Sequence, residues 1–231
     1  MSQGRNFQIV FGVVVVVGVV FLASKLMGGK PVSIPANPVV TTADTAGFHG
    51  YLIGDAAAPI EITEYADYQC PGCANFDQVQ WPVVVTSLIK TGKVRWRYRD
   101  FPLDNLHSHT RVAAHAAACA DEQGKFWEVK GLLFGRQNDW APIGDPMPVF
   151  KEIVQGSGMD YDKWLGCMQS AKFAGRIQAS QDEGTKIGIN ETPSFLIGGR
   201  IYTGLNSDMV TKLVDSLTAL APAAQAVPKK P

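Results

Sequence analysis

Glu64-Tyr65-Ala66-Asp67-Tyr68-Gln69-Cys70-Pro71-Gly72-Cys73 joins a predicted strand to a predicted helix, with two cysteines at the junction. Alternating apolar residues favour a strand over residues 59–65, and residues 71–90 have helical character. Cys70 would then lie at the helix N-terminus, with Pro71 at the first helical position, where its missing N–H has no cost. The segment therefore predicts a strand-to-helix turn that carries a Cys-x-x-Cys motif.

The spacing of the two cysteines predicts thiol–disulfide chemistry. The positive end of the helix dipole and its free N–H groups favour a thiolate on Cys70 and lower its pKa. Cys73 returns to the same helix face one turn later and can close a disulfide with Cys70. We expect Cys70 to be the attacking thiolate and Cys73 to resolve the mixed disulfide.

Three other interpretations of this cysteine pair remain open. A zinc half-site needs two further ligands, and no second Cys-x-x-Cys or HxxxH-like pair lies nearby, so we expect no metal. A purely structural disulfide in so tight a loop would gain little unfolded-state entropy. Two inert buried thiols are the third alternative, and redox chemistry is favoured over all three.

Glu64 is a candidate acid–base group. By the two-residue period of a strand it shares a face with Ile60 and Ile62, so it points inward if the isoleucines face the core. A carboxyl group buried beneath the cysteines would have a raised pKa and could exchange a proton with Cys73. An exposed glutamate at the strand end is the alternative, because the register is not determined by the pattern alone.

The rest of the pattern predicts an α/β fold. Pro82 is expected to kink or restart the first helix. The next elements are a second strand at residues 94–98 and a long helical stretch at residues 105–188. A hairpin at residues 194–203 and a last amphipathic helix at residues 207–220 complete the pattern. Because strands lie on both sides of the helical stretch, we expect one mixed sheet with a helical block inserted into it.

The N-terminus carries a hydrophobic segment. Residues 7–24 are 18 residues without a charge, and a helix of this length spans about 27 Å, close to the thickness of the bilayer core. We predict a transmembrane anchor rather than a cleaved signal peptide, because the apolar run exceeds the roughly 7–15 residues usual for a signal. Residues 28–49, which contain several prolines and glycines, are predicted to form an extended tether.

The composition excludes one class of partner. Hydrophobic residues make up 46% of the 231 residues and charged residues 18%, which is sufficient for a buried core. Lys and Arg together number 21, as do Asp and Glu. Without a basic stripe, a nucleic-acid partner is not expected.

The segment containing Cys70 and Cys73 resembles the active-site segment of DsbA-like thiol oxidoreductases. Residues 190–195, Asn-Glu-Thr-Pro-Ser-Phe, resemble the cis-proline loop of that family, and residues 124–127, Gly-Lys-Phe-Trp, resemble a signature of its helical domain. The resemblance covers roughly residues 50–220. It implies a thioredoxin-like fold interrupted by a helical domain.

The resemblance also implies roles for the loop around Pro193. Pro193 would follow a cis peptide bond, and Thr192 would offer its backbone groups to an extended substrate chain beside Cys70. An ordinary proline opening an edge strand is the alternative. Pro71 and Gly72 would support the active site from within the motif.

The expected organisation has six parts. Residues 1–27 form a cytoplasmic stub with the transmembrane anchor (or signal peptide), and residues 28–49 form the tether. A first thioredoxin-like part covers residues 50–104, the helical insertion residues 105–188 and a second thioredoxin-like part residues 189–220. Residues 221–231 are a disordered tail.

Cys119 and Cys167 form the remaining cysteine pair. Outside the cytoplasm two lone thiols tend to be oxidised, so we predict a structural disulfide between two helices. Such a bond would contribute about 2–4 kcal/mol to stability. Two separate buried thiols or a second redox centre are the alternatives, and the family resemblance permits the disulfide without requiring it.

The predicted function is dithiol oxidation in exported proteins that contain cysteines. The Cys70–Cys73 disulfide would pass to the client, and no other cofactor is expected. By the resemblance, a membrane-embedded quinone-linked oxidase would restore it. An oxidising role requires a compartment outside the cytoplasm, so the protein is expected in the cytoplasmic membrane, single-pass, with its globular domain facing the periplasm or cell exterior.

Two alternative functions remain. A reductase or isomerase kept reduced by another carrier is possible because Pro71-Gly72 contains no histidine, and Thr192 before Pro193 resembles less oxidising family members. A peptide-binding chaperone or assembly factor could use the same fold without catalysis. The presence of both cysteines together with Glu64 speaks against the chaperone.

Overall fold

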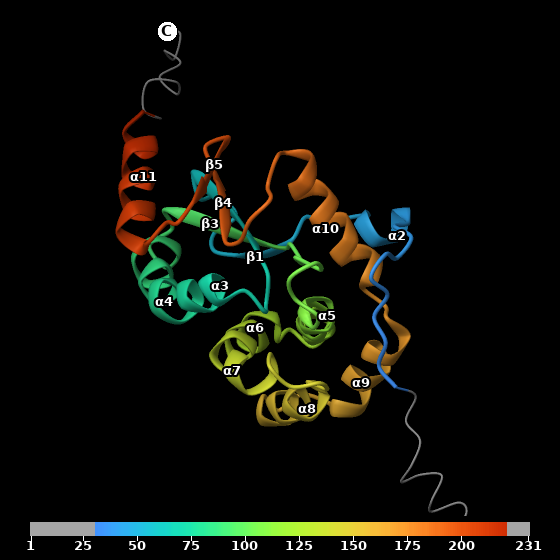
Figure 1. Ribbon diagram of the computed structural model, residues 1–231. Helices are drawn as coiled ribbons and strands as arrows, with labels where there is room; N and C mark the ends of the chain where they lie inside the picture. The colour runs from blue at the N-terminus through green and yellow to red at the C-terminus, as the bar shows by residue number, and fades with distance from the viewer. Residues whose placement is uncertain (1–30, 221–231) are drawn as a thin grey trace, which may run out of the picture. The chain divides into compact units, whose positions relative to one another are not determined.

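The computed structural model describes residues 31–220 and contains one five-stranded mixed sheet (Figure 1). The strand order is β1-β3-β2-β4-β5, in which β2 and β3 are parallel and the other neighbours are antiparallel. The strands are β1 (Tyr51–Ile53), β2 (Ile60–Ala66), β3 (Val94–Asp100), β4 (Ser194–Ile197) and β5 (Arg200–Thr203). The predicted α/β fold with a helical insertion is confirmed.

The central strand β2 is covered on both faces. On one face Ile62 packs with Trp96 and Phe195 in the main hydrophobic core, beneath the helix that follows β2 and beneath α11 (Ser207–Leu220). On the other face Tyr65 packs with Phe101. Because both of its faces are covered, Thr63 and Glu64 are buried together with the apolar residues of β2, whereas Glu61 near the start of the strand is exposed.

The helix after β2 changes its winding along its length. It consists of α3 (Pro71–Asn75), the π-helical turn η1 (Phe76–Gln80), α4 (Trp81–Val84) and the π-helical turn η2 (Val85–Ile89). Pro82 is the second residue of α4, directly after the first π-helical stretch. A widened turn before a proline accommodates the missing N–H without ending the helix.

The helical block lies between β3 and β4 in the chain. It consists of α5 (Thr110–Asp121), α6 (Phe126–Gly135), α7 (Gln137–Trp140), α8 (Met147–Gly156), α9 (Tyr161–Ser170) and α10 (Ala174–Lys186). In Figure 1, α5 to α9 form a group beyond one end of the sheet, whereas α10 runs back alongside it.

Helix α10 belongs to the sheet as much as to the helical block. Glu183 accepts a hydrogen bond from the Tyr65 hydroxyl at 2.8 Å and pairs with Arg99. A Cβ on Gly184 would come within 2.7 Å of the Phe101 ring, so only glycine allows the helix this close. The last helix of the predicted insertion therefore covers the second face of the sheet.

The stretch predicted as a tether, residues 28–49, contains a short helix and contacts to the folded domain over its C-terminal part. Residues 33–49 belong to the same compact unit as the sheet, and α2 (Thr42–Thr45) lies within the stretch expected to be extended. Phe48 packs edge-to-face on Tyr51, with 5.0 Å between ring centroids, and the Arg176 guanidinium lies 4.1 Å from the Phe48 ring centroid. The contact between Phe48 and Arg176 joins residues distant in sequence, so no local period could indicate it.

Within residues 31–220, no helix is long and apolar enough to cross a membrane. The predicted transmembrane segment, residues 7–24, and the predicted tail, residues 221–231, lie outside the described residues.

Candidate active site

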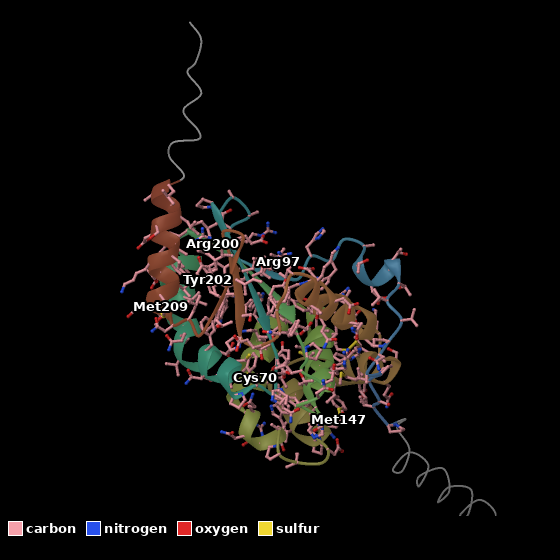
Figure 2. All side chains as sticks on the ribbon, turned by 45° about the horizontal axis from the view of Figure 1, so that its top comes forward. Cys70, Arg97, Met147, Arg200, Tyr202 and Met209 are labelled. Carbon is pink, nitrogen blue, oxygen red and sulfur yellow. A yellow bond between two sulfur atoms is a disulfide. The ribbon has the colours of Figure 1, made fainter. Side chains whose placement is uncertain are left out.

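Cys70 lies directly before α3, which follows β2, and Cys73 lies in the first turn of α3; Cys70 is labelled in Figure 2. Cys70 is the N-cap residue, with extended backbone angles (φ −71°, ψ 122°), and Pro71 is the first helical residue. Both cysteines are free thiols; 9% of Cys70 is exposed, and Cys73 is fully buried. Both residues are thus buried, and Cys70 alone of the two keeps a small accessible fraction.

The pKa of the Cys70 thiol is lowered to about 5. The largest cause is a hydrogen bond with the Cys73 thiol, which outweighs the opposing effect of burial. The Thr192 side chain and the backbone N–H groups of Cys73 and Gly72 lower it further. The helix N-terminus therefore stabilises the thiolate as predicted, but the largest contribution comes from the second cysteine.

Cys73 has the opposite tendency. Burial raises the pKa of its thiol well above the usual value, and the neighbouring Cys70 and Glu64 raise it further. The Cys73 thiolate is consequently a strong base that takes up a proton as soon as it forms. The pair is asymmetric: Cys70 is suited to attack and to leave as a thiolate, and Cys73 to hold a proton.

The loop around Pro193 lies directly against Cys70. The Thr192–Pro193 peptide bond is cis, and the Thr192 carbonyl accepts a hydrogen bond from Cys70 Sγ at 3.3 Å. A Cβ on Gly72 would lie 3.3 Å from Pro193 Cδ. Glycine at position 72 therefore permits close approach of the two loops, which places the Thr192 backbone beside Cys70.

Glu64 is fully buried, so its side chain faces inward as its alternation with the isoleucines predicted. Its Oε2 accepts a hydrogen bond from Trp96 Nε1 at 3.0 Å, whereas its Oε1 has no partner in the protein. Burial raises the pKa of the Glu64 carboxyl, with Lys130 acting against burial and Asp77 adding to it. A carboxyl near Cys73 with a raised pKa and one free oxygen can accept and return a proton.

The structure adds a buried ion pair that sequence reasoning missed. Lys130 of α6 and Asp77 of η1 are 1% and 4% exposed and pair with each other. The Lys130 ammonium also lies 4.7 Å from the Trp81 ring centroid and 5.2 Å from that of Tyr98. The pair brings one positive and one negative charge close to Glu64, and only the packing of α6 against η1 could reveal it.

The helical block holds the chain just before the cysteines. Gln137 is buried and donates through Nε2 to the carbonyls of Tyr68 and Cys70, at 2.7 and 3.1 Å. Gln69 donates to the Ala141 carbonyl at 3.0 Å and accepts from the His109 N–H at 2.6 Å. These bonds keep the turn in one conformation and were not predicted from the sequence.

Asp67 ties the same turn to the β3–α5 connection. Its carboxylate accepts from the backbone N–H groups of Gln69 and Leu103, each at 2.7 Å, and lies 2.9 Å from His107 Nδ1. Asp67 is fully buried. Such carboxylate bonds to backbone N–H groups fix loop geometry.

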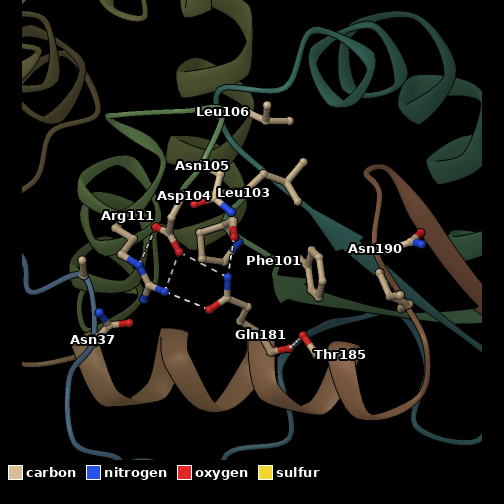
Figure 3. A pocket seen from close by; sticks show the side chains of 13 residues that line it. Asn37, Phe101, Leu103, Asp104, Asn105, Leu106, Arg111, Gln181, Thr185 and Asn190 are labelled. Carbon is tan, nitrogen blue, oxygen red and sulfur yellow. Dashed lines mark hydrogen bonds and ion pairs between the residues drawn. The ribbon is translucent and has the colours of Figure 1, made fainter.

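A cavity of about 800 Å³ lies beside the residues that precede the cis-proline loop (Figure 3). Its walls come from the β3–α5 connection, from α10 and from Ile189 and Asn190. Arg111 forms a two-point ion pair with Asp104 and also donates to Gln181 at 2.8 Å. The guanidinium is therefore engaged in bracing the cavity wall.

Cys119 and Cys167 form a disulfide between α5 and α9, with 5.8 Å between their Cα atoms and 48 residues between them in sequence. They are 1% and 6% exposed. His115 Nδ1 lies 3.4 Å from Cys119 Sγ. These three residues are the cluster within residues 31–220 with metal-ligand spacing, and the disulfide engages both sulfurs.

The fold and this site together define a thiol–disulfide oxidoreductase domain, built on a thioredoxin-like sheet with a helical insertion. The chain belongs to the thioredoxin family, because the family model described as thioredoxin matches residues 48–216.

Two crystal structures have a similar fold. Wolbachia pipientis alpha-DsbA1 has a TM-score of 0.66 at 24% identity, covering 73% of this chain and 90% of that chain. Chlamydia trachomatis DsbA has a TM-score of 0.69 at 18% identity, covering 81% of this chain and 99% of that chain.

Curated relatives differ in overall length. The Na(+)/H(+) antiporter NhaA 3 of Salinispora tropica is 31% identical over 154 residues, which are 67% of this chain but 22% of the antiporter. The chain spans less than a quarter of that relative. The probable disulfide bond formation protein D of Bacillus anthracis is 22% identical over 167 residues, covering 71% of this chain and 76% of that protein.

Proposed function

We propose that this protein oxidises pairs of thiols in exported proteins. A client thiolate attacks Cys70 Sγ of the Cys70–Cys73 disulfide, and the electron pair of the broken bond goes to Cys73, which takes a proton from Glu64. A second client thiol loses its proton and attacks the client sulfur of the mixed disulfide. Cys70 then leaves as a thiolate, so the client is oxidised and the protein reduced.

The observation that carries this proposal is the low pKa of Cys70, about 5. The contacts that lower it stabilise the thiolate, which exists only in the reduced protein. A stabilised reduced form makes the disulfide a stronger oxidant, and it makes Cys70 the better leaving group. The direction of transfer is therefore from the protein disulfide to the client.

The location and the recycling partner follow from this role. An oxidant of dithiols works in compartments where disulfides persist, outside the cytoplasm. The uncharged stretch at residues 7–24 would anchor the protein in the cytoplasmic membrane with its folded domain outside. A membrane-embedded, quinone-linked oxidase that restores Cys70–Cys73 would meet an anchored protein in the same bilayer.

The test is the reduction potential of the Cys70–Cys73 couple, measured together with oxidation of a reduced two-cysteine peptide. We expect a potential nearer to about −120 mV than to about −270 mV, the two ends for such proteins. Cys70→Ser should abolish peptide oxidation. A strongly reducing potential, with rapid reduction of insulin and a reduced pair in cells, would instead support the reductase or isomerase.

Membrane location needs a separate test. A membrane-impermeant thiol reagent, applied to intact cells after reduction, should label Cys70 in the wild type and nothing in Cys70→Ser. Labelling only after lysis would contradict the proposed orientation.

A further inference from the structure

Five buried residues form a polar row with an unusual number of unpaired atoms. Among residues 31–220, ten buried side-chain N or O atoms have no hydrogen-bond partner, and six of these belong to the row. Its members are Tyr51, Glu64, Tyr68, Tyr98 and Asp100. Buried polar groups are usually paired, so a concentration in one place requires an explanation.

Strand register places the row on one face of the sheet. Glu64 of β2 is paired with Tyr98 of β3, and Tyr98 is paired with Tyr51 of β1. Residues paired in neighbouring strands point to the same face, so three side chains cross three strands side by side. Asp100 follows Tyr98 by two residues and shares that face.

Tyr68 lies over the middle of the row. Its ring centroid is 5.7 Å from that of Tyr98, and the Tyr98 hydroxyl is close enough to lower the pKa of Tyr68, against the larger effect of burial. Asp100 acts by its charge on Tyr51, Tyr68 and Tyr98 alike. The side chains of the row therefore interact with one another electrostatically.

Aromatic residues of α6 seal the row from solvent. Phe126 stacks on Tyr51 with 3.5 Å between ring centroids, and Phe134 stacks on Tyr68 at 4.9 Å. None of the five members of the row is more than 4% exposed. A proton released at Cys73, which is itself fully buried, has no direct path to water.

The two ends of the row differ. At one end Glu64 and Tyr98 both interact with Cys73 by charge. At the other end Tyr51 interacts by charge with Arg176 of α10 and with Asp121 of α5, which is exposed. The row thus extends from the enclosed cysteine to an exposed aspartate on the helical block.

The charged groups that face the two carboxyls of the row come from several elements. Asp100 faces Arg99, Arg176 and Asp67, and burial raises its pKa to about 7. Glu64 faces Lys130 and Asp77. Asp100 can therefore hold or release a proton near neutral pH, in the middle of a sealed row.

We propose that this row, from Glu64 through Tyr98, Tyr68 and Asp100 to Tyr51, is a proton relay. It delivers a proton to the Cys73 thiolate and accepts the proton that the Cys73 thiol releases. The inference rests on the proposed thiol–disulfide exchange and adds four positioning and proton-carrying residues to it. When the protein disulfide opens, the Cys73 thiolate takes the Glu64 proton, and the Tyr98 hydroxyl donates its proton to the Glu64 carboxylate. Tyr98 regains a proton from Asp100 or Tyr68.

The reverse reaction runs the same relay outward. When a reduced protein closes its disulfide, the Cys73 thiol gives its proton to Glu64 and its sulfur attacks Cys70 in the mixed disulfide. The leaving thiolate departs with the electron pair of the broken bond. The Glu64 proton then passes along the row, so the number of protons in the row is unchanged after each turnover.

The test follows reoxidation of the reduced, full-length protein by a small aromatic disulfide. The first phase is attack by Cys70 and does not need the relay; the second is closure by Cys73 and does. Acid quenching and mass spectrometry count the free protein, the mixed disulfide and the closed disulfide over time from pH 5 to 9. Tyr98→Phe and Asp100→Asn interrupt the row with nearly unchanged shape.

Tyr65→Phe is the matched control. Tyr65 follows Glu64 in the same strand and is equally buried, but it points to the other face, where its hydroxyl donates to Glu183. Its first and second phases should match the wild type. Thermal unfolding of all variants should show that both row variants stay folded at the assay temperature: Tyr98→Phe removes an unpaired buried hydroxyl, and Asp100→Asn replaces a buried ionisable carboxyl with a neutral amide of the same shape.

We expect both row variants to keep the first phase and to slow the second by about 10-fold, so that the mixed disulfide accumulates. This is less than the ~10²–10⁴-fold typical of a direct general base. Asp100→Asn should also remove an inflection near pH 7 in the second phase. A wild-type second phase and pH profile in both variants would overturn the relay, whereas a missing first phase in the wild type would overturn the proposed function instead.

Discussion

The two cysteine pairs of this protein have the same composition but opposite surroundings. Cys70 and Cys73 are three residues apart at a helix N-terminus, and their pKa values are shifted in opposite directions. Cys119 and Cys167 are 48 residues apart, enclosed between two helices and joined by a disulfide. Asymmetric stabilisation of one thiolate makes a pair reactive, whereas burial and a long loop make a pair structural.

Exchange of thiols should depend on the first pair alone. Cys70→Ser should lower peptide oxidation by more than about 1,000-fold, because no other nucleophile is placed at the helix N-terminus. Cys73→Ser should leave the first attack intact and accumulate mixed disulfides through Cys70. The Cys119→Ser, Cys167→Ser double variant should stay within about twofold of wild-type turnover. Loss of turnover in that double variant, with the fold intact by circular dichroism, would give the second pair a redox role.

Reactivity within the first pair should follow the pKa difference. Since the pKa of Cys70 is about 5, its thiolate fraction rises as pH increases through 5 and is nearly complete at pH 7. Alkylation of the reduced protein should therefore be half-maximal near pH 5, and at pH 7 Cys70 should react more than about 100-fold faster than Cys73. Peptide mapping after brief alkylation measures this ratio. Faster labelling of Cys73 would reverse the two roles.

Substitution of Glu64 should affect catalysis and stability in opposite directions. Glu64→Gln removes the proton acceptor beside Cys73, so closure of the disulfide should slow by about 100-fold at pH 7. Burial raises the pKa of Glu64; a raised carboxyl pKa destabilises the fold as pH rises and the group ionises. The variant should thus be as stable as the wild type at low pH and more stable above neutral pH, as measured by urea unfolding. A uniform loss of stability would indicate a structural role instead.

The second pair should matter for stability alone. Closing its loop should contribute about 2–4 kcal/mol, so the double serine variant should unfold at correspondingly lower urea concentration. Reduction of the wild type under conditions that open Cys119–Cys167 provides a matched control without any mutation. Equal stability of variant and parent would show that the disulfide only fills space between α5 and α9.

The features that could be predicted from the sequence are those that depend on residues close together in the chain. The order of strands and helices, the helix beginning at Pro71 and the different roles of Cys70 and Cys73 all depend on residues within a few positions of each other. For the same reason the hairpin at β4 and β5 and the last helix were predicted close to their observed bounds. Periodicity and capping act over one or two turns, and such signals are legible in the chain itself.

The contacts that could not be predicted from the sequence depend on packing between segments far apart in the chain. The Lys130–Asp77 pair, the Gln137 bonds to the active-site turn and the contacts of Phe48 and Arg176 join segments dozens of residues apart.

The polar row also depends on which strands become neighbours. Strand register alone places Tyr51, Glu64 and Tyr98 side by side. Glu64 can be singled out from its own segment, but Tyr51 and Tyr98 cannot, because the two-residue period of a strand indicates a face but not a partner. The sequence by itself therefore determined the reactive pair, the fold class and Glu64 as a candidate proton-exchanging group, and only the tertiary structure determined which other polar side chains lie beside that carboxyl.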